Sequence, residues 1–162
     1  YTHSTTWSRI ASASIDGKKL PYPAISEIFA GSRDRLKSSR YLLEMGDINV
    51  RLSNSGLLVA TGTGSTGWYK AAASCIHEES PSFPPTEESA RFYTTEAFFS
   101  RLAADFPRGG VLAKGEELII TNRSHRPGVV SVDSLGNHMF PRGAVARIEV
   151  SDQSLRVAKI FF

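Results

Sequence analysis

The alternation of apolar and polar side chains predicts a chain built mainly from short strands. Residues 48–52 alternate at a period of two, which is typical of a strand with one face in solvent. Asp16-Gly17 and Gly46-Asp47 supply tight turns between apolar segments. Residues 24–30 fit either a strand or a short helix. Further strands are predicted at residues 9–15, 40–45, 57–60, 118–121, 128–133, 144–150 and 155–161.

Two helices are predicted in the middle of the chain. Residues 68–75 combine helix-favouring alanines with a preceding glycine turn. A proline- and acid-rich loop is expected at residues 77–86, and residues 87–91 continue it or form a short helix. Residues 94–106 begin with Thr94 or Thr95 as a cap and repeat apolar residues at helical spacing: Phe98, Phe99, Leu102 and Phe106.

Together these elements predict a single domain of mainly β (α+β) class. Antiparallel strands joined by short turns, with one central helix and an inserted one, favour a β-sandwich-like architecture. The length of 162 residues is that of one domain. No repeat or low-complexity tract divides the sequence.

Composition and charge narrow the range of partners. The formal charge of +3 suits a polyanionic small ligand, and because the basic residues are scattered along the sequence, a nucleic-acid interface is not expected. A single cysteine, Cys75, excludes a disulfide within the chain and favours an intracellular compartment, either cytoplasmic or mitochondrial. We expect no membrane span, because no apolar run is long enough. We expect no metal site, because His125 and His138 lack neighbours at ligand spacing.

The strongest functional signal lies in residues 54–75. An apolar strand leads into residues 61–67, where three glycines are interleaved with hydroxyl side chains, and a helix follows. Glycine lets a ligand approach the backbone, Ser and Thr offer donors, and a helix start presents unpaired N–H groups to an anion. The pattern predicts a nucleotide-binding turn. The alternative is a tight turn with a capped helix and no ligand.

Two common phosphate motifs do not fit this turn. Gly62, Gly64 and Gly67 spell G-x-G-x-x-G, but the acidic residue that a Rossmann site needs about 20 residues later falls in the proline-rich residues 78–85. A Walker loop needs Lys directly after its last glycine, where this chain has Trp68.

Three segments together resemble the C-terminal, NAD-binding domain of NAD kinases. The segments are ISEIFAG at residues 25–31, NSGLLVATGTGSTGWY at 54–69 and VVSVDSLGNHMFPRGAVARIEV at 129–150. The Gly-Thr-Gly-Ser spelling is similar to that of the divergent, mitochondrial-type members. The resemblance covers about residues 9–75 and 128–160. Residues 76–127 match poorly and are predicted to be an insertion within the domain.

The resemblance implies which residues hold NAD. Ser26 stands where the family has Asn, and Glu27 keeps the family's Glu, both beside the adenosine part. Ser55 replaces an Asp, and Trp68 replaces a Tyr as the aromatic side chain near the adenine. The glycine turn and the residue after Ser55 complete the expected NAD contacts: Gly56, Thr63, Gly64, Ser65, Thr66 and Gly67, the last in place of Ala.

The activity that the resemblance implies is phosphorylation of NAD at the adenosine 2′-hydroxyl, with ATP and Mg²⁺, to give NADP. The family's Gly-Gly-Asp-Gly-Thr sequence belongs to an N-terminal α/β domain, and this chain, which begins at Tyr1, does not contain it. We therefore expect a fragment of a two-domain kinase with no catalytic residue of its own, inactive alone and completed by the missing domain. Family members commonly self-associate, so a homo-oligomer is expected.

Two other functions stay open at this point. A related lipid kinase of the diacylglycerol or sphingoid type would need an apolar acyl-chain groove, which Phe98, Phe99 and Phe106 could line. A non-catalytic sandwich module that binds a protein partner would use the glycine turn for structure only.

Overall fold

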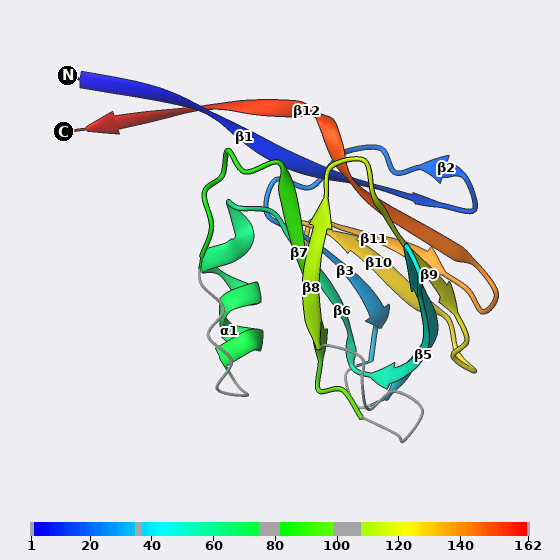
Figure 1. Ribbon diagram of the computed structural model, residues 1–162. Coiled ribbons are helices and arrows are strands. Elements are labelled where there is room, and N and C mark those ends of the chain that lie inside the picture. The colour runs from blue at the N-terminus through cyan, green and yellow to red at the C-terminus, as the bar shows by residue number, and fades with distance from the viewer. Residues whose placement is uncertain (1, 35–36, 75–81, 99–107, 162) are drawn as a thin grey trace.

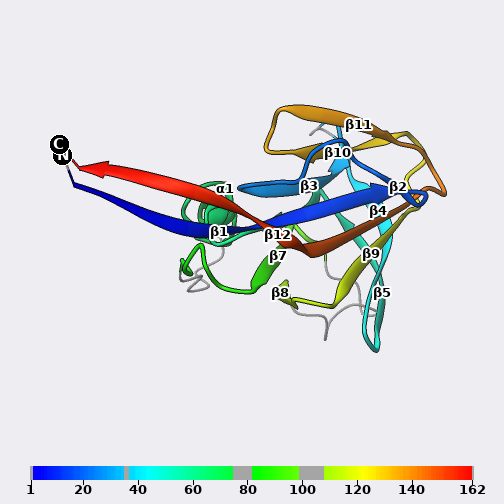
Figure 2. The same ribbon diagram turned by 90° about the horizontal axis from the view of Figure 1, so that it is seen from above.

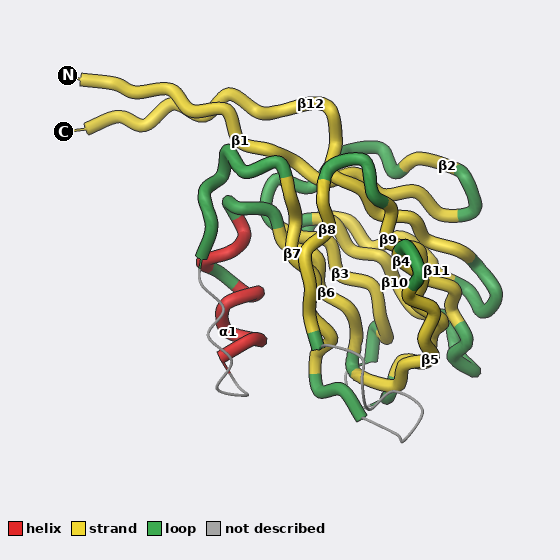
Figure 3. The backbone as a smooth tube through the Cα atoms, viewed as in Figure 1, coloured by secondary structure: helices red, strands yellow, loops and turns green. Residues whose placement is uncertain are grey.

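The computed structural model describes residues 2–34, 37–74, 82–98 and 108–161 (Figure 1). Within these residues, two antiparallel sheets of six strands each account for most of the chain, and one short α-helix accompanies them. Figure 3 shows the same balance, with strands throughout and the helical residues gathered at one side. The predicted mainly β, sandwich-like class is confirmed.

Each sheet combines strands from both halves of the chain. The first sheet has the order β2-β1-β12-β9-β4-β5, with β1 (Thr2–Ile15), β2 (Lys18–Lys19), β4 (Ser39–Met45), β5 (Ile48–Asn54), β9 (Glu117–Asn122) and β12 (Val145–Phe161). The second has the order β11-β10-β3-β6-β7-β8, with β3 (Glu27–Ser32), β6 (Gly56–Ala60), β7 (Ser89–Thr95), β8 (Gly109–Ala113), β10 (Gly128–Val132) and β11 (Gly136–Phe140).

The main core fills the space between the two sheets. Alternate residues of each strand point inward, as the burial of every second residue of β9 shows. The largest side chains that this core buries completely come from both sheets: Ile28, Leu43, Leu57, Phe92, Leu112, Leu118, Ile120 and Ile148. Apolar burial of this kind is the main favourable term in folding the domain.

A buried amide ties the two sheets together at one end. The Asn122 side chain, at the end of β9, is 3% exposed, and its Nδ2 donates to the Phe140 carbonyl of β11 at 2.6 Å. Its Oδ1 accepts from the backbone N–H of Ser124 at 2.8 Å. Because burying an unpaired polar group is costly, this residue fixes one relative position of the two sheets.

The paired strands β1 and β12 continue beyond the sandwich as a two-stranded arm that carries both ends of the chain (Figures 1 and 2). Their register shifts where Arg9 pairs with Ser154 and Ala11 with Val150, so residues 151–153 form a bulge opposite Ile10. The prediction of two strands separated at residues 152–153 was therefore wrong, because those polar residues bulge without ending β12.

The predicted elements differ from the observed ones mainly where no clean alternation exists. Residues 87–91 were expected to be a loop or a short helix, but Ser89 begins β7. Thr94 and Thr95 end that strand and cap no helix, and residues 99–106 of the predicted helix lie outside the described part. Six of the seven residues of β7 are buried, so its pattern carries no period of two.

Three further predictions were wrong in detail. Residues 53–56 were expected to form a turn, but only Ser55 interrupts the strands there. The strands β8 and β11 replace predicted loops at residues 107–110 and 135–143. The described parts of residues 76–127 supply β7 and β8 to the second sheet and β9 to the first, and the insertion of this range stays a prediction. Among the described helical residues, none forms a helix long and apolar enough to cross a membrane.

Replacing Asn122 with Ala should lower the free energy of unfolding by about 1–3 kcal/mol, because the Phe140 carbonyl loses its buried donor. Urea denaturation of the 162-residue chain measures this. The matched control is Asn49→Ala on the exposed side of β5, which should change the unfolding free energy by no more than about 0.5 kcal/mol. Equal losses for the two variants would show that Asn122 does not tie the sheets.

Candidate functional site

The glycine turn begins where β6 ends on the second sheet. All five residues of β6 are buried, because Leu57 and Val59 face the main core while Leu58 and Ala60 face outward under a helix. The chain then passes through the 3-10 turn η1 (Gly64–Thr66) into α1 (Trp68–Ser74). Tyr69 and Ala73 of α1 cover the outer face of β6. Because the main core covers one face of β6 and α1 covers the other, the strand is a continuous apolar run.

The glycine turn lies directly against Ser26. The Thr61 backbone N–H donates to the Ser26 carbonyl at 2.9 Å, and the Thr61 hydroxyl donates to the Ile25 carbonyl at 2.5 Å. A Cβ added at Gly64 would lie 2.1 Å from the Ser26 carbonyl oxygen, so only glycine fits this approach. The fold therefore brings together two of the segments that the sequence singled out.

The predicted turn residues differ in how open they are. Ser65 is completely buried, and its hydroxyl donates to the Gly62 carbonyl at 2.7 Å and accepts from the Phe83 N–H at 3.2 Å. Its hydroxyl is thus engaged by the chain's own backbone. Thr66 and Gly67 are exposed. The hydroxyl of Thr63 is buried and has no hydrogen-bond partner among the described residues.

Asp133 completes this region, although the sequence reasoning did not select it. Its carboxylate accepts the backbone N–H groups of Ile25, Ser26 and Glu27 at 2.7, 2.8 and 3.0 Å. Asp133 and Ser134 both have positive φ, +48° and +57°, in the tight turn between β10 and β11. A strand followed by Asp-Ser signals such a turn, but nothing local in the sequence reveals a partner more than 100 residues away.

Glu27 begins β3 beside this carboxylate. Its side chain is partly exposed, and partial burial, followed by the nearby negative charge of Asp133, raises the pKa of its carboxyl above the ordinary value of 4.5. A carboxyl accepts hydrogen bonds through both of its oxygens. Such a group suits recognition of sugar hydroxyls.

The outer face of β3 next carries an aromatic stack. Phe29 lies two residues after Glu27 and so faces the same side. A Cβ at Gly56 would lie 2.3 Å from the Phe29 ring and one at Gly31 would lie 2.8 Å from it, so the ring rests on two bare stretches of backbone. Trp68 stacks on Phe29 with 5.2 Å between ring centroids and an interplanar angle of 26°. Gly56 is thus needed to admit this ring.

Ser55 and Gly56 lie at the far end of β6 from the glycine turn. Gly56 pairs with Gly31, whereas Ala60 pairs with Glu27. The Ser55 backbone donates to the Thr95 carbonyl at 3.0 Å. The structure therefore does not bring Ser55 to Glu27, and Gly56 reaches the rest of the site only through Phe29.

A groove of about 300 Å³ opens beside the aromatic stack. Strand register explains its composition, because Phe29 pairs with Ser131 and Ser131 with Asn137. The groove offers apolar ring surfaces, hydroxyl and amide groups, and one cation. Such a lining fits a planar heterocycle with polar edges. It is formed by Phe29, Ser32, Arg33, Trp68, Val129, Ser131, Ser134 and Asn137.

Comparison with known proteins adds no family assignment. No protein-family model matches this sequence, and a search of curated proteins found no significant match.

Replacing Gly56 with Ala should lower the unfolding free energy by about 1–3 kcal/mol, because the new methyl group overlaps the Phe29 ring. Urea denaturation measures the loss. The control repeats the substitution in a Phe29→Ala background, where the overlap with the ring is gone and only the strain of the positive φ at Gly56 remains, so the loss should be smaller. The same loss of unfolding free energy in both backgrounds would show that the Phe29 ring does not pack against Gly56.

Replacing Glu27 with Gln should stabilise the unliganded chain near neutral pH. The raised pKa means that the wild-type side chain supports folding fully below pH 4.5 and loses that contribution as the pH rises through the folded-state pKa. The difference in Tm between variant and wild type should therefore grow from pH 4.5 to 7.5, reaching about 1–3 °C for so exposed a group. A difference that shrinks over this range would contradict the assigned direction.

Proposed function

We propose that this chain is the NAD-binding domain of an NAD kinase, which in the full-length protein phosphorylates NAD at the adenosine 2′-hydroxyl with ATP. One observation carries the proposal: the glycine turn rests on the backbone of Ser26, beside Glu27. These segments are 35 residues apart in the sequence, and the resemblance to NAD kinases selects both. The antiparallel pairing of β3 with β6, in which Glu27 lies opposite Ala60, brings them together.

Different parts of NAD are assigned to different residues of the site. The adenine is assigned to the groove beside Trp68 and Phe29, where aromatic stacking stabilises a flat ring by about 1–3 kcal/mol. Ser131 and Asn137 offer hydrogen bonds to its edge, and the carboxyl of Glu27 is assigned to the ribose hydroxyls. Thr66 and Gly67 are the exposed part of the turn, open to a phosphate. Ser65 holds the turn in shape through its buried hydroxyl.

The chemical step itself requires groups outside this chain's described residues. Among those residues, no group of three His, Cys, Asp or Glu side chains is placed to hold a metal ion. The Asp133 carboxylate, beside Glu27, already accepts three backbone N–H groups. The residues here therefore do not fit Mg²⁺, and no step is assigned to it on this chain. The proposal includes a partner domain with the Gly-Gly-Asp-Gly-Thr sequence, and self-association of the intact kinase.

Binding can be tested through the fluorescence of Trp68. The chain has two tryptophans, so a Trp7→Phe variant on the exposed arm leaves Trp68 as the sole reporter. Titration with NAD should quench its emission saturably. Glu27→Gln in this background should weaken binding about tenfold or more, because the amide keeps only one of the two acceptor oxygens of the carboxyl. The control Glu44→Gln, on β4 of the first sheet, should leave binding unchanged.

The same titration separates the alternatives. An unchanged emission with NAD, together with a saturable response to sphingosine, would replace the proposal by a lipid kinase. Equal affinity for NAD with Gln or Glu at position 27 would show that Glu27 is not part of the NAD site. The chain alone should form no NADP from NAD and ATP.

A further inference from the structure

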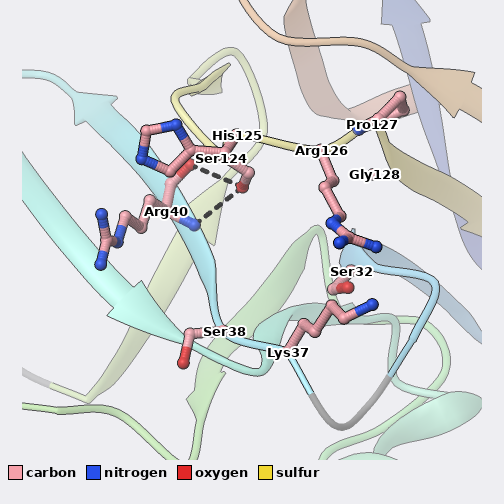
Figure 4. A pocket seen from close by; sticks show the side chains of 9 residues that line it. All are labelled: Ser32, Lys37, Ser38, Arg40, Ser124, His125, Arg126, Pro127 and Gly128. Atoms are coloured by element: carbon pink, nitrogen blue, oxygen red, sulfur yellow. Dashed lines mark hydrogen bonds between the residues drawn. The ribbon is translucent and has the colours of Figure 1, made fainter.

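A second pocket lies at the end of β3 opposite Glu27. It has a volume of about 280 Å³ and opens between the loop that joins β3 to β4 and the loop that joins β9 to β10 (Figure 4). Lys37, Ser38 and Arg40 form one wall, and the segment from Ser124 to Gly128 forms the other. None of the ten residues that the resemblance assigns to NAD binding lines this pocket.

The fold concentrates positive charge around this pocket. Among the described residues of the two loops and their strand ends, five cations stand against the single carboxylate of Asp34. The whole chain has a net charge of only +3. The basic residues look scattered in sequence because more than 80 residues separate the two loops. The five cations are Arg33, Lys37, Arg40, Arg123 and Arg126.

Two of these cations point into the same part of the pocket. Figure 4 shows the Lys37 ammonium and the Arg126 guanidinium approaching from opposite walls toward Ser32, while Arg40 points the other way. Lys37 pairs with Asp34 at 2.9 Å, and both side chains are more than 40% exposed. An exposed ion pair of this kind stabilises little, so an anion can compete for Lys37.

The walls are held in place before any ligand arrives. The Arg40 N–H donates to the Ser124 hydroxyl at 2.9 Å, and the Arg123 N–H donates to the Arg40 carbonyl at 2.7 Å. The Ser124 N–H in turn donates to the buried Asn122 side chain at 2.8 Å. The positive charges of Lys37 and Arg126 repel one another, the Asp34 carboxylate offsets part of that repulsion, and a bound anion would reduce it further. The arrangement is therefore suited to an anion of fixed position.

We propose that this pocket binds a phosphate group, either free phosphate or the phosphate of a small phosphorylated molecule. Arg126 offers a planar fork of donors that matches two phosphate oxygens, and Lys37 offers a point charge from the other wall. The volume exceeds that of one phosphate, so the organic part of a small ester also fits. The pocket adjoins the aromatic groove, with which it shares Ser32, but Lys37 and Arg126 do not line that groove. The phosphate site therefore goes beyond the proposed kinase function.

The test is calorimetric titration of the 162-residue chain with inorganic phosphate and, separately, with glycerol 3-phosphate, at constant ionic strength. We expect saturable binding of one equivalent, and comparison of the two probes identifies which source of phosphate is preferred. Lys37→Ala and Arg126→Ala should each weaken binding about tenfold or more. Arg156→Ala, on the arm formed by β1 and β12, should have no effect.

Several outcomes would overturn the proposal. Binding that is absent for both probes, or that falls equally in Arg156→Ala, would show that the pocket is not a phosphate site. Binding only of a uridine dodecamer, with a steep salt dependence, would assign the surface to nucleic acid. The NAD-dependent quenching of Trp68 should be unchanged in Lys37→Ala, so failure of this site and failure of the NAD site are distinguishable.

Discussion

The candidate site depends on the hydrogen bonds that hold residues 25–27 in place at the start of β3. Asp133 accepts their N–H groups from one side, and Thr61 donates to the carbonyls of Ile25 and Ser26 from the other. These three bonds fix the position of the Asp133 carboxylate against the backbone at the start of β3. One fixed anion thereby sets the start of β3, the entry to the glycine turn, and the electrostatic surroundings of Glu27.

The glycines of the chain show how close backbone approach builds the site. Gly64 admits Ser26, Gly62 admits the Pro84 carbonyl, and Gly56 admits the Phe29 ring. Each is a contact of the chain with itself. A G-x-G-x-x-G spelling therefore does not by itself imply a phosphate, because two of its glycines are fully explained by packing. What favours a ligand is the groove that these approaches leave beside Trp68 and Phe29.

The sequence predicted those parts of the molecule whose signals are local. The class of fold, the strand at residues 57–60 and the helix after the glycine turn follow from runs and turns of a few residues. It failed at β7, which is buried on both faces, and at β11, an edge strand with Asn137 and His138. It also missed Asp133 and the charge cluster, because both depend on which distant loops the two sheets bring together.

Strand β3 contributes residues to both proposed sites. Ile28 and Ala30 point into the main core and fix the strand, which places Glu27 and Phe29 on the outer face and Ser32 at the edge of the basic pocket. Cores transmit small displacements because they are packed without free volume. The geometry of both proposed sites therefore depends on the same buried side chains of β3.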